Sequence, residues 1–585
     1  MKMKKICYTD ERNAQIVIAL LKAHGIKRVV ASPGATNASF VWMLQNDEFF
    51  TLYSAVDERH ASYLACGIAA ETNEPVVLSC TGATSSRNYM SALTEAYYRK
   101  LPILAITSSQ PIHRLGHMWP QMTDRTMPPS DTVKLSVQCP IPNGMEEVWA
   151  CEIDVNKAIL ELSRHGGGPV HINLETRAPG SFPVEVLPPV RKISRVTVDG
   201  SWPEFPKNKK IAIMIGSHRP FNDDETECIE KFAESCNAVV LADRTSNYFG
   251  KSVINSSLLL SQNIFENPEY KDLCPELVIH IGEISGDYPT FRQLTGRCEV
   301  WRVSEDGEIR DLMQGLRLVF EMSEMQFFKH YIQSCGNNTY LSAWKTTDVK
   351  IRARLPEIPF SNLWIAQHLH DEIPDGAEIH FGILNSLRSW NMFQTNGIVS
   401  FCNVGGFGID GCVSSLIGAS FIDNKKLYFG VFGDLAFFYD LNAMGNRHVG
   451  KNLRILVVNN GMGVEFANPG SIGNSIGGDV KEYIAAGAHF GQQSQKLLRN
   501  IAENLGFEYL SASNEHEFTV AKTAFLKKES SKPILLECFV NPQDDATALK
   551  AYRSISGFIP VPSVRSRIGS VLPDALKNVI RKVGI

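Results

Sequence analysis

The chain has 585 residues, of which 44% are hydrophobic and 21% charged, as is ordinary for a globular protein. Its net charge of −4 gives no indication of nucleic acid or another polyanion as a partner. The lysines at the start are not followed by an apolar segment, and no apolar run approaches the roughly 20 residues that span a bilayer. We therefore expect neither a signal peptide nor a membrane anchor.

The 13 cysteines are odd in number and form no CxxC pair. Two of them, Cys80 and Cys538, lie within apolar runs. Buried thiols in a reducing cytoplasm explain this usage better than disulfides or a zinc site. We therefore expect a cytoplasmic protein.

The first part of the chain, up to about residue 190, alternates short apolar runs with segments of helical spacing such as 13–25. Each apolar run ends in a polar residue or a Gly/Pro turn. This alternation predicts a parallel sheet covered by helices, and ligands of such sheets bind at the carboxyl ends of the strands. The predicted strands are KRVVASPG, TLYSAVDE, PVVLSCTG, LPILAITS and GPVHINLE.

The same alternation occurs twice more along the chain. The Pro-rich segment 177–192 is typical of a linker, and the pattern loosens again at 336–360. We therefore predict an α/β protein of three doubly wound parallel-sheet domains, at 1–190, 191–350 and 351–585. The predicted strands of the second domain are KIAIMIGSH, AVVLADR, LVIHIGE and EVWRVSE, and those of the third are AEIHFG, GIVSFCN, KLYFGVFGD, LRILVVNN and KPILLECFV.

Two neighbouring predicted strands of the third domain end in side chains that can bind metal. Asp434 follows one strand and Asn460 follows the next, with a segment of helical spacing between them. Because a right-handed crossover can place both strand ends at one edge of the sheet, we expect the two side chains to meet. Two oxygen ligands suit Mg²⁺, which completes its octahedron with water and phosphate oxygens. The alternative is a plain βαβ unit in which these residues form turns.

This stretch resembles the thiamin diphosphate motif, in which a G-D pair and a later N-N pair follow two strands. The G-D pair ending at Asp434 and the N-N pair ending at Asn460 match it, and Leu435 stands where many members have a second glycine. The resemblance implies that Asp434, Asn460 and the backbone carbonyl of Met462 hold a divalent cation, Mg²⁺, which bridges the diphosphate of thiamin diphosphate.

The first and third domains carry further residues of the same family pattern. In AVDERHASYLACGIA, Glu58 matches the glutamate whose carboxyl group bonds the aminopyrimidine ring and promotes its imino tautomer. In NVGGFGIDG, Ile409 matches the apolar residue beneath the cofactor, and the Phe407 carbonyl matches the acceptor for the 4′-amino group. The other cofactor contacts that the resemblance implies are Asn88, Asn385, Ser386, Gly433 and Leu435.

These positions also have purely structural interpretations. Glu58 fits an exposed acid at a helix start, where the macrodipole favours it, and Ile409 fits a core residue. Asn385 and Ser386 suit a helix N-cap. Exposed N–H groups at such a helix start would serve the same anion.

Within the thiamin diphosphate family of 2-oxo acid decarboxylases and carboligases, most of the chain resembles the menaquinone-pathway SEPHCHC synthases, which join 2-oxoglutarate to isochorismate. The order of a pyrimidine-binding, a central and a diphosphate-binding domain is also that of the family. The matching stretches are SPG at 32–34, DER at 57–59, CTGATSSRNYMSALTEAYY at 80–98, GIDG at 408–411 and GDLAFFYDLNAM at 433–444.

The substrate pocket departs from those synthases, which hold carboxylates with arginines because a planar guanidinium binds them bidentately. Four positions that the resemblance assigns to arginine are occupied by Thr36, Gln110, Trp390 and Val404. We therefore expect a different acceptor. Nearby cations that are candidates for the pocket, each with a surface or structural role as the alternative, are Arg87, His113, Arg114, His117 and Arg388.

Three residues, His60, His117 and Gln121, are candidates for proton transfer or for contact with the reacting carbon. Histidine titrates near neutral pH, so His60 and His117 are possible proton shuttles. Gln121 matches a glutamine that reaches the reacting carbon in related synthases.

The resemblance implies decarboxylation of a 2-oxo acid, with the cofactor taking the electrons as CO₂ leaves, and transfer of the acyl-anion equivalent to an acceptor carbonyl or alkene. A simple decarboxylase, an acetolactate-synthase-like flavoprotein and a non-catalytic cofactor-binding paralogue are the alternatives. In this family the cofactor lies between the pyrimidine domain of one subunit and the diphosphate domain of another. We therefore expect a homodimer or homotetramer whose partners are a 2-oxo acid donor and an unknown acceptor.

Overall fold

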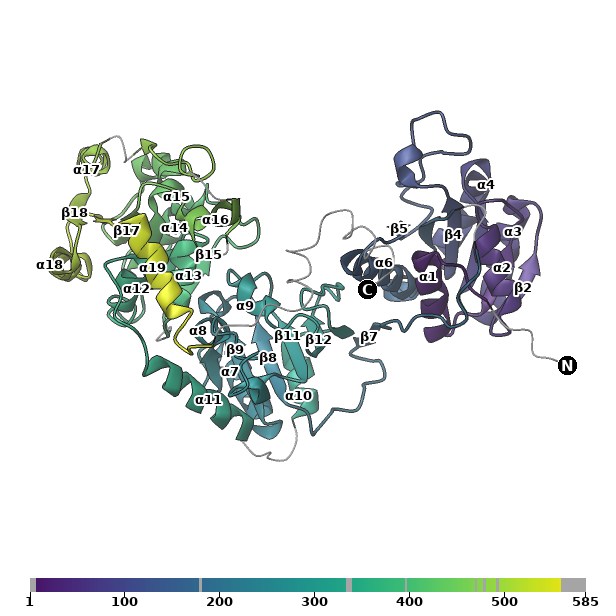
Figure 1. The fold of residues 1–585 in the computed structure, drawn as a ribbon, viewed down its shortest axis with the longest axis horizontal. Helices are drawn as coiled ribbons and strands as arrows, with labels where there is room; N and C mark the ends of the chain where they lie inside the picture. Colours follow the sequence, from purple (N-terminus) through teal and green to yellow (C-terminus); the bar gives the residue numbers. More distant parts are fainter. Residues whose placement is uncertain are drawn as a thin grey trace. The chain divides into compact units, whose positions relative to one another are not determined.

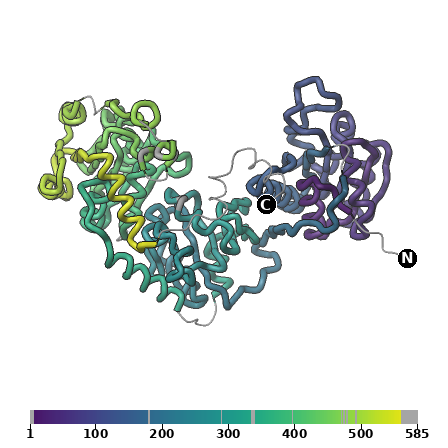
Figure 2. Tube along the Cα trace, viewed as in Figure 1, coloured from purple at the N-terminus to yellow at the C-terminus, as the bar shows by residue number. Residues whose placement is uncertain are grey.

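The structure is a computed structural model that describes residues 7–177, 181–332, 339–394, 397–468, 471–476, 480–490 and 494–558 (Figure 1). The chain divides into two compact units. Among the described ranges, the first unit holds the residues up to 195 with 317–319, and the second holds 196–316 with the residues from 320 onward. Figure 2 traces the chain by colour from its N-terminal to its C-terminal residues.

The first unit is built on a six-stranded sheet with the strand order β2-β1-β3-β4-β6-β5. All of its strand pairs are parallel, as the alternation of strands and helices predicts. Its strands are β1 (Arg28–Ala31), β2 (Thr51–Ser54), β3 (Val76–Thr81), β4 (Ile103–Ser109), β5 (Leu135–Cys139) and β6 (Val170–Glu175). Its helices are α1 (Arg12–Ala23), α2 (Ala38–Asn46), α3 (Glu58–Thr72), α4 (Ala83–Asn88), α5 (Met90–Arg99) and α6 (Met145–Glu161), with the short η1 (Ile112–Arg114) and η2 (Arg164–Gly166).

Two apolar cores cover the two faces of this sheet. Alternate residues of one strand point to opposite faces, so Val77 belongs to the core with α1 and α6 while Leu78 belongs to the core with α3 and α5. The central strands β3 and β4 are buried throughout, which explains their continuous apolar sequences. The edge strand β2 is mostly exposed.

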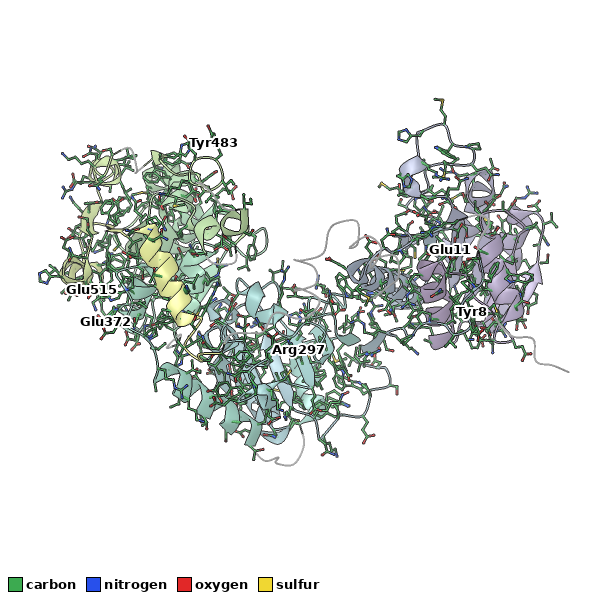
Figure 3. All side chains as sticks on the ribbon, viewed as in Figure 1. Tyr8, Glu11, Arg297, Glu372, Tyr483 and Glu515 are labelled. Atoms are coloured by element: carbon green, nitrogen blue, oxygen red, sulfur yellow. The ribbon has the colours of Figure 1, made fainter. Side chains whose placement is uncertain are left out.

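The Pro-rich segment predicted as a linker packs against the first unit over part of its length. Tyr8 donates its backbone N–H to the Val184 carbonyl at 2.6 Å, and its hydroxyl donates to Asp47 at 2.9 Å. Tyr8 and the neighbouring Glu11 are labelled in Figure 3. Residues 178–180 of this segment lie outside the described ranges.

The central sheet, whose strands β8 to β12 lie in the second unit, has the strand order β10-β9-β8-β11-β12-β13-β7. The pairs that join β10, β9, β8, β11 and β12 are parallel. The strands are β7 (Ser194–Thr197), β8 (Ile211–Ile215), β9 (Ala238–Ala242), β10 (Val253–Asn255), β11 (Leu277–Ile281), β12 (Glu299–Ser304) and β13 (Leu316–Glu321). The helices are α7 (Asp223–Ser235), α8 (Ser256–Leu260), α9 (Tyr288–Arg292), α10 (Glu324–Tyr331) and α11 (Thr339–Arg352), with η3 (Arg244–Ser246) and η4 (Lys271–Leu273).

The C-terminal sheet, also in the second unit, has the strand order β15-β14-β16-β17-β19-β18, and all of its pairs are parallel. Its strands are β14 (Glu378–Phe381), β15 (Val399–Cys402), β16 (Tyr428–Gly433), β17 (Leu453–Asn459), β18 (Glu508–Ala512) and β19 (Ile534–Phe539). Its helices are α12 (Asn362–Gln367), α13 (Asn385–Asn391), α14 (Cys412–Ser420), α15 (Asp434–Tyr439), α16 (Ile472–Ile476), α17 (Leu497–Asn504), α18 (Glu515–Phe525) and α19 (Pro542–Tyr552), with η5 (Leu441–Gly445) and η6 (Val464–Ala467).

A buried arginine links the central and C-terminal sheets of the second unit. Arg244 is fully buried, and its guanidinium donates to the backbone carbonyls of Trp390 at 2.8 Å and Gln394 at 2.6 Å. Burial lowers its pKa to about 9. Helix α11 occupies part of 336–360, where the sequence pattern loosens, and buries Tyr340 and Trp344.

The prediction of an α/β protein with three parallel sheets is confirmed. The described cysteines are all free thiols. No helix among the described residues is long and apolar enough to cross a membrane.

Candidate active site

The strand ends that carry Asp434 and Asn460 lie side by side in the C-terminal sheet. Strands β16 and β17 pair in parallel, with Gly433 opposite Val458, so Asp434 and Asn460 both follow at the carboxyl edge. The Asp434 carboxylate accepts hydrogen bonds from the backbone N–H groups of Leu435, Asn460 and Gly461. The structure thus brings together the two groups that the sequence predicts to meet.

Asp434 is a buried carboxylate whose surroundings leave its charge uncompensated. It is the first residue of α15, and burial raises its pKa to about 7. The hydrogen bonds from backbone N–H groups oppose this rise without cancelling it. No ion pair among the described residues includes Asp434. A cation at this point would restore the ordinary ionised state of the carboxyl group.

The Asn460 side chain is held at both of its polar atoms. Its Nδ2 donates to Oδ2 of Asp545 at 3.1 Å, and its Oδ1 accepts from the Met462 backbone N–H at 3.3 Å. Asp545 is buried in α19, also accepts the Asn362 N–H at 2.7 Å, and has its pKa raised to about 6 by burial. No sequence motif marks Asp545, because its partner Asn460 lies 85 residues away along the chain.

The helix start at Asn385 lies close to the loop that follows Asn460. Asn385 opens α13, and Leu384 before it adopts a left-handed φ of 71°. Asn468 donates its Nδ2 to Asn385 Oδ1 at 2.9 Å. Ser386 is buried behind it. The side chains of Asn385 and Asn468 are therefore in contact at the edge of the sheet.

The glycine-rich segment before α14 makes an irregular loop. Phe407 adopts φ 55°, a left-handed backbone conformation that is costly for a residue with a side chain. Ile409 is half-buried, and glycines 405 and 406 beside this pair are exposed. The loop therefore presents both Phe407 and Ile409 near its surface.

In the first unit, Glu58 begins α3 at the carboxyl end of β2. The preceding Asp57 caps the helix by accepting the His60 N–H at 3.0 Å. Glu58 itself is half-buried. Burial raises the pKa of Cys80 to about 12, and the nearby charge of Glu58 adds to the shift. Asn88, at the end of α4, is exposed.

A long loop after β4 carries the other candidates of the first unit. His117 and Gln121 are exposed, and Gln121 has φ 62°. Arg87 donates to the Asp124 carbonyl at 2.6 Å, which ties α4 to this loop. The Arg114 guanidinium lies 4.2 Å from the ring centre of Trp119, a cation–π contact.

Comparison with known proteins identifies the family to which this chain is similar. Residues 12–127 match the family described as thiamine pyrophosphate enzyme, N-terminal TPP binding domain. Two proteins with the name 2-succinyl-5-enolpyruvyl-6-hydroxy-3-cyclohexene-1-carboxylate synthase are similar over nearly their whole length. The one from Bacteroides thetaiotaomicron is 33% identical over 572 residues, and the one from Bacteroides fragilis is 32% identical over 574 residues, with 93% of this chain and 99% of each relative covered.

A synthase of the same name from Christiangramia forsetii is 28% identical over 568 residues, with 90% of this chain and 95% of that protein covered. The chain belongs to the thiamine pyrophosphate enzymes. Within them it belongs to the family of these synthases. The cofactor of this thiamine pyrophosphate enzyme is therefore thiamin diphosphate, with Mg²⁺ as the usual partner metal. The chain is an enzyme of the class that couples decarboxylation to C–C bond formation with an acceptor.

The residues of this thiamine pyrophosphate enzyme fit a divalent cation at the ends of β16 and β17. Asp434 supplies a buried carboxylate without a cationic partner, and Asn460 and Met462 supply an amide oxygen and a carbonyl. These are the hard oxygen donors that Mg²⁺ prefers. In the described part of the chain, no group of three or more His, Cys, Asp or Glu residues could hold a metal ion.

Each unit of this thiamine pyrophosphate enzyme holds two of the four replaced positions, Thr36 and Gln110 in the first and Trp390 and Val404 in the second. Thr36 is buried and donates its hydroxyl to the Ser108 carbonyl at 2.7 Å, while Gln110 accepts from Arg114. Trp390 is fully buried, with its ring 5.3 Å from that of Phe381. Val404 is also buried. Their roles in substrate binding stay predictions.

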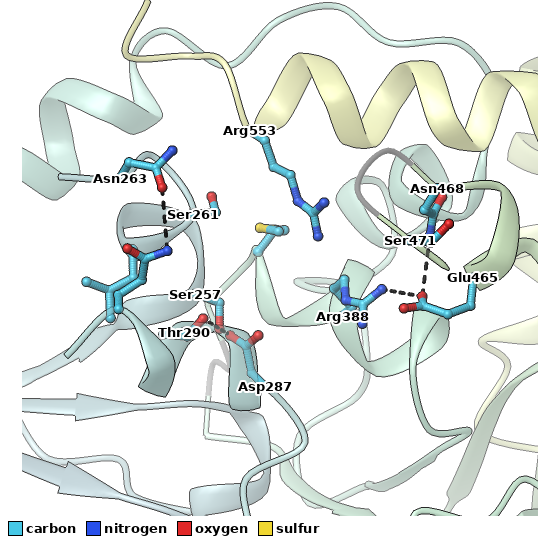
Figure 4. A pocket seen from close by; sticks show the side chains of 13 residues that line it. Ser257, Ser261, Asn263, Asp287, Thr290, Arg388, Glu465, Asn468, Ser471 and Arg553 are labelled. Atoms are coloured by element: carbon cyan, nitrogen blue, oxygen red, sulfur yellow. Dashed lines mark hydrogen bonds and ion pairs between the residues drawn. The ribbon is translucent and has the colours of Figure 1, made fainter. Parts of the chain in front are cut away.

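Arg388 lines a cavity of the second unit, shown in Figure 4, and pairs with Glu465. This cavity has a volume of about 400 Å³. It adjoins the diphosphate-side residues, because the Arg388 Nη1 lies 3.5 Å from Asn385 Oδ1. Arg388 is thus the one predicted pocket residue that the described structure places on this cavity.

Proposed function

We propose that this enzyme decarboxylates a 2-oxo acid and transfers the acyl-anion equivalent to an acceptor carbonyl or alkene. The observation that carries the proposal is the convergence of Asp434 and Asn460 at one sheet edge, in a chain that also retains Glu58. When bound, thiamin diphosphate supplies the nucleophilic carbon and accepts the electron pair released with CO₂.

The proposed roles of the residues follow from their chemistry. Asp434, Asn460 and the Met462 carbonyl would hold Mg²⁺, and the N–H groups at the start of α13 would support the diphosphate. The Phe407 carbonyl and Ile409 would contact the aminopyrimidine part of the cofactor. Such contacts would orient the cofactor, and orientation favours a fast unimolecular step.

Glu58 is proposed to hold or release a proton at the aminopyrimidine nitrogen. Its position at a strand end and helix start, half-buried beside Cys80 and Tyr89, gives it a partly apolar setting. His117 and Gln121 are proposed to contact the acceptor substrate. Both side chains are exposed on the loop after β4, and neither forms a side-chain hydrogen bond to the sheet within the described residues. Asn88 and Arg87 are proposed as further contacts on the end of α4.

The acceptor is proposed to differ from that of the curated relatives. Their printed name describes a product with a succinyl group and a ring carboxylate. Thr36, Gln110, Trp390 and Val404 stand where the resemblance assigns arginines to hold such groups. Two of these, Trp390 and Val404, are buried hydrophobic residues that offer no charge to a carboxylate.

A homodimer or homotetramer is proposed as the active form in the cytoplasm. The surface near Glu58 supports this, since Tyr53, Val56 and Tyr63 expose apolar side chains around it. An exposed apolar surface of this kind is typical of a protein interface. A second subunit that covers it would also exclude water from Glu58.

The test is to supply the purified protein with thiamin diphosphate and Mg²⁺ and to screen 2-oxo acids for CO₂ release. We expect release from one donor, and a coupled product when the matching acceptor is present. CO₂ release with protonated aldehyde as the only product, whatever the acceptor, would favour a simple decarboxylase. A flavin spectrum in the purified protein would favour the acetolactate-synthase-like alternative.

A further inference from the structure

The cavity in Figure 4 has walls from both sheets of the second unit. Asp287 and Thr290 border it from α9 and its N-cap, next to the central sheet, and Arg388 and Glu465 border it from α13 and η6, next to the C-terminal sheet. Arg553, just past the end of α19, points into the space between them. The cavity of about 400 Å³ is large enough for a small metabolite.

The backbone on both sides of Arg553 is fixed by one buried side chain. Gln262 donates its Nε2 to the Tyr552 carbonyl at 2.6 Å, and its Oε1 accepts the Ser556 N–H at 3.0 Å. Gln262 and Tyr552 are both fully buried. Because the chain is held before and after Arg553, the position of this residue over the cavity is set by the fold.

The Arg553 guanidinium forms no hydrogen bond or ion pair in the described part of the chain, and Arg553 is half-buried. Burial lowers its pKa, and the charge of Arg388 lowers it further. Arg388 itself forms an ion pair with Glu465, which also accepts from Asn468 at 3.4 Å. The charges of Glu465 and Asp287 raise the pKa of Arg553 and oppose this lowering, but neither carboxylate forms an ion pair with Arg553 in the described residues. One cation of the cavity is thus left to be satisfied by a ligand.

This cation lies near the predicted cofactor contacts. Asn468 borders the cavity and donates to Asn385 Oδ1, and Arg388 approaches the same oxygen. Helix α19 carries Asp545 near its start, bonded to Asn460, and ends just before Arg553. One helix therefore joins the predicted metal loop to the cavity.

We propose that this cavity binds an oxyanion of the acceptor substrate, a carboxylate or a phosphate, on Arg553. The inference deepens the proposed function and rests on it. A guanidinium presents a planar pair of donors that matches either oxyanion bidentately, and a partly buried site strengthens the contact. The donor loses its own carboxylate as CO₂, so a fixed anion site suits a substrate that keeps its charge through the reaction.

The test measures anion binding to the protein loaded with thiamin diphosphate and Mg²⁺, by isothermal titration with succinate and with inorganic phosphate. We expect one of the two anions to bind the wild type, which identifies carboxylate or phosphate as the group. Arg553→Gln should weaken that binding by about tenfold or more, and Arg553→Lys should weaken it less, because charge remains while the bidentate geometry is lost. Arg499→Gln, which changes an exposed arginine of the same unit, should bind as the wild type.

Thermal melting of each variant shows whether it is folded, and Arg553→Lys keeps the test decisive if Arg553→Gln does not fold. The proposal is overturned if the wild type binds neither anion, or if both Arg553 variants bind as the wild type. CO₂ release by the wild type is measured in parallel. If the wild type releases CO₂ and the Arg553 variants bind the anion as well as the wild type does, the anion site on Arg553 is rejected while the proposed reaction stands. Loss of binding without any release from 2-oxo acids would reject the proposed reaction and keep the anion site.

Discussion

The carboxylate of Asp545 accepts a hydrogen bond from the amide of Asn460, with 3.1 Å between Oδ2 and Nδ2. An asparagine amide has one acceptor end and one donor end. When the donor end is taken by Asp545, the Oδ1 end is fixed on the opposite side, where Met462 and Asp434 lie. We therefore expect Asp545 to act as a positioning residue that turns the predicted ligand oxygen of Asn460 toward Mg²⁺.

Replacing Asp545 by alanine should weaken Mg²⁺-dependent binding of thiamin diphosphate by about tenfold or more, as is usual when a residue that orients a metal ligand is lost. Equilibrium titration of the cofactor at several Mg²⁺ concentrations measures this without any substrate. Asp544→Ala, which changes the neighbouring and less buried carboxylate, is the matched control. Equal cofactor affinity in the Asp545 variant and the control would show that the Asn460 side chain does not need Asp545 for its orientation.

Anion binding in the cavity beside Arg553 should strengthen as the pH falls from 8 to 5. Burial raises the pKa of Asp287 to about 6, so this carboxyl takes up a proton over that range and its negative charge is removed from the cavity. The other charges that face it are Arg388, Arg553 and Glu465, with Asp243 behind it through Ser285.

Sulfate is the suitable probe because its own charge is constant over these pH values. We expect a gain of about three- to tenfold in affinity, the size of one charge interaction at intermediate dielectric. Asp287→Asn should bind sulfate with the low-pH affinity throughout and give a flat profile. A profile that is unchanged in Asp287→Asn would assign the titration to Glu465 or another group.

The contact between Arg244 and the Trp390 carbonyl should matter for the stability of the second unit. Arg244→Leu leaves buried carbonyls of Trp390 and Gln394 without donors, so the free energy of unfolding should fall by about 2 to 4 kcal/mol. Scanning calorimetry should show this loss of stability as a lower melting temperature. Arg219→Leu, at an exposed position of the same unit, should melt within error of the wild type. If both variants melt alike, the buried arginine is replaceable by apolar packing.

Much of the fold could be predicted because the central strands are buried on both faces. Strands such as β3, β4 and β17 give continuous apolar runs that stand out in the sequence. The half-buried edge strands β5 and β18 were not predicted, since their mixed polarity resembles that of loops. The helix predicted after Asp434 is broken at Asp440 into α15 and η5, where the carboxylate of Asp440 accepts from Ser414.

The candidate site could be predicted only where it follows a strand end. Asp434 and Asn460 could be found because each directly follows an apolar run that predicts a strand. Asp545 and Arg553 could not, because their partners come from distant parts of the chain and only tertiary packing brings them together. Trp390, predicted at the substrate pocket because the resemblance assigns an arginine to its position, is a buried ring against Phe381. Its part in substrate binding stays a prediction.

The loaded enzyme should be a dimer or larger. Light scattering on the protein with thiamin diphosphate and Mg²⁺ measures the molar mass and so the oligomeric state. Val56→Lys places a charge in the exposed apolar surface near Glu58, so this variant should contain more monomer than the wild type. Glu372→Lys, an exposed position of the second unit, serves as the control for the added charge. A fully active monomer would contradict the proposed interface.

The central claim, that this enzyme uses Glu58 with thiamin diphosphate to make a C–C bond from a 2-oxo acid, is tested most directly by comparing the wild type with Glu58→Gln. Each is loaded with cofactor and Mg²⁺, given a ¹³C-labelled 2-oxo acid that the wild type decarboxylates, and followed by NMR for CO₂ release and for the coupled product. The account predicts that the wild type forms the product and that Glu58→Gln, with cofactor still bound, loses about 100-fold or more of the rate. Product formation at the wild-type rate by Glu58→Gln would contradict it.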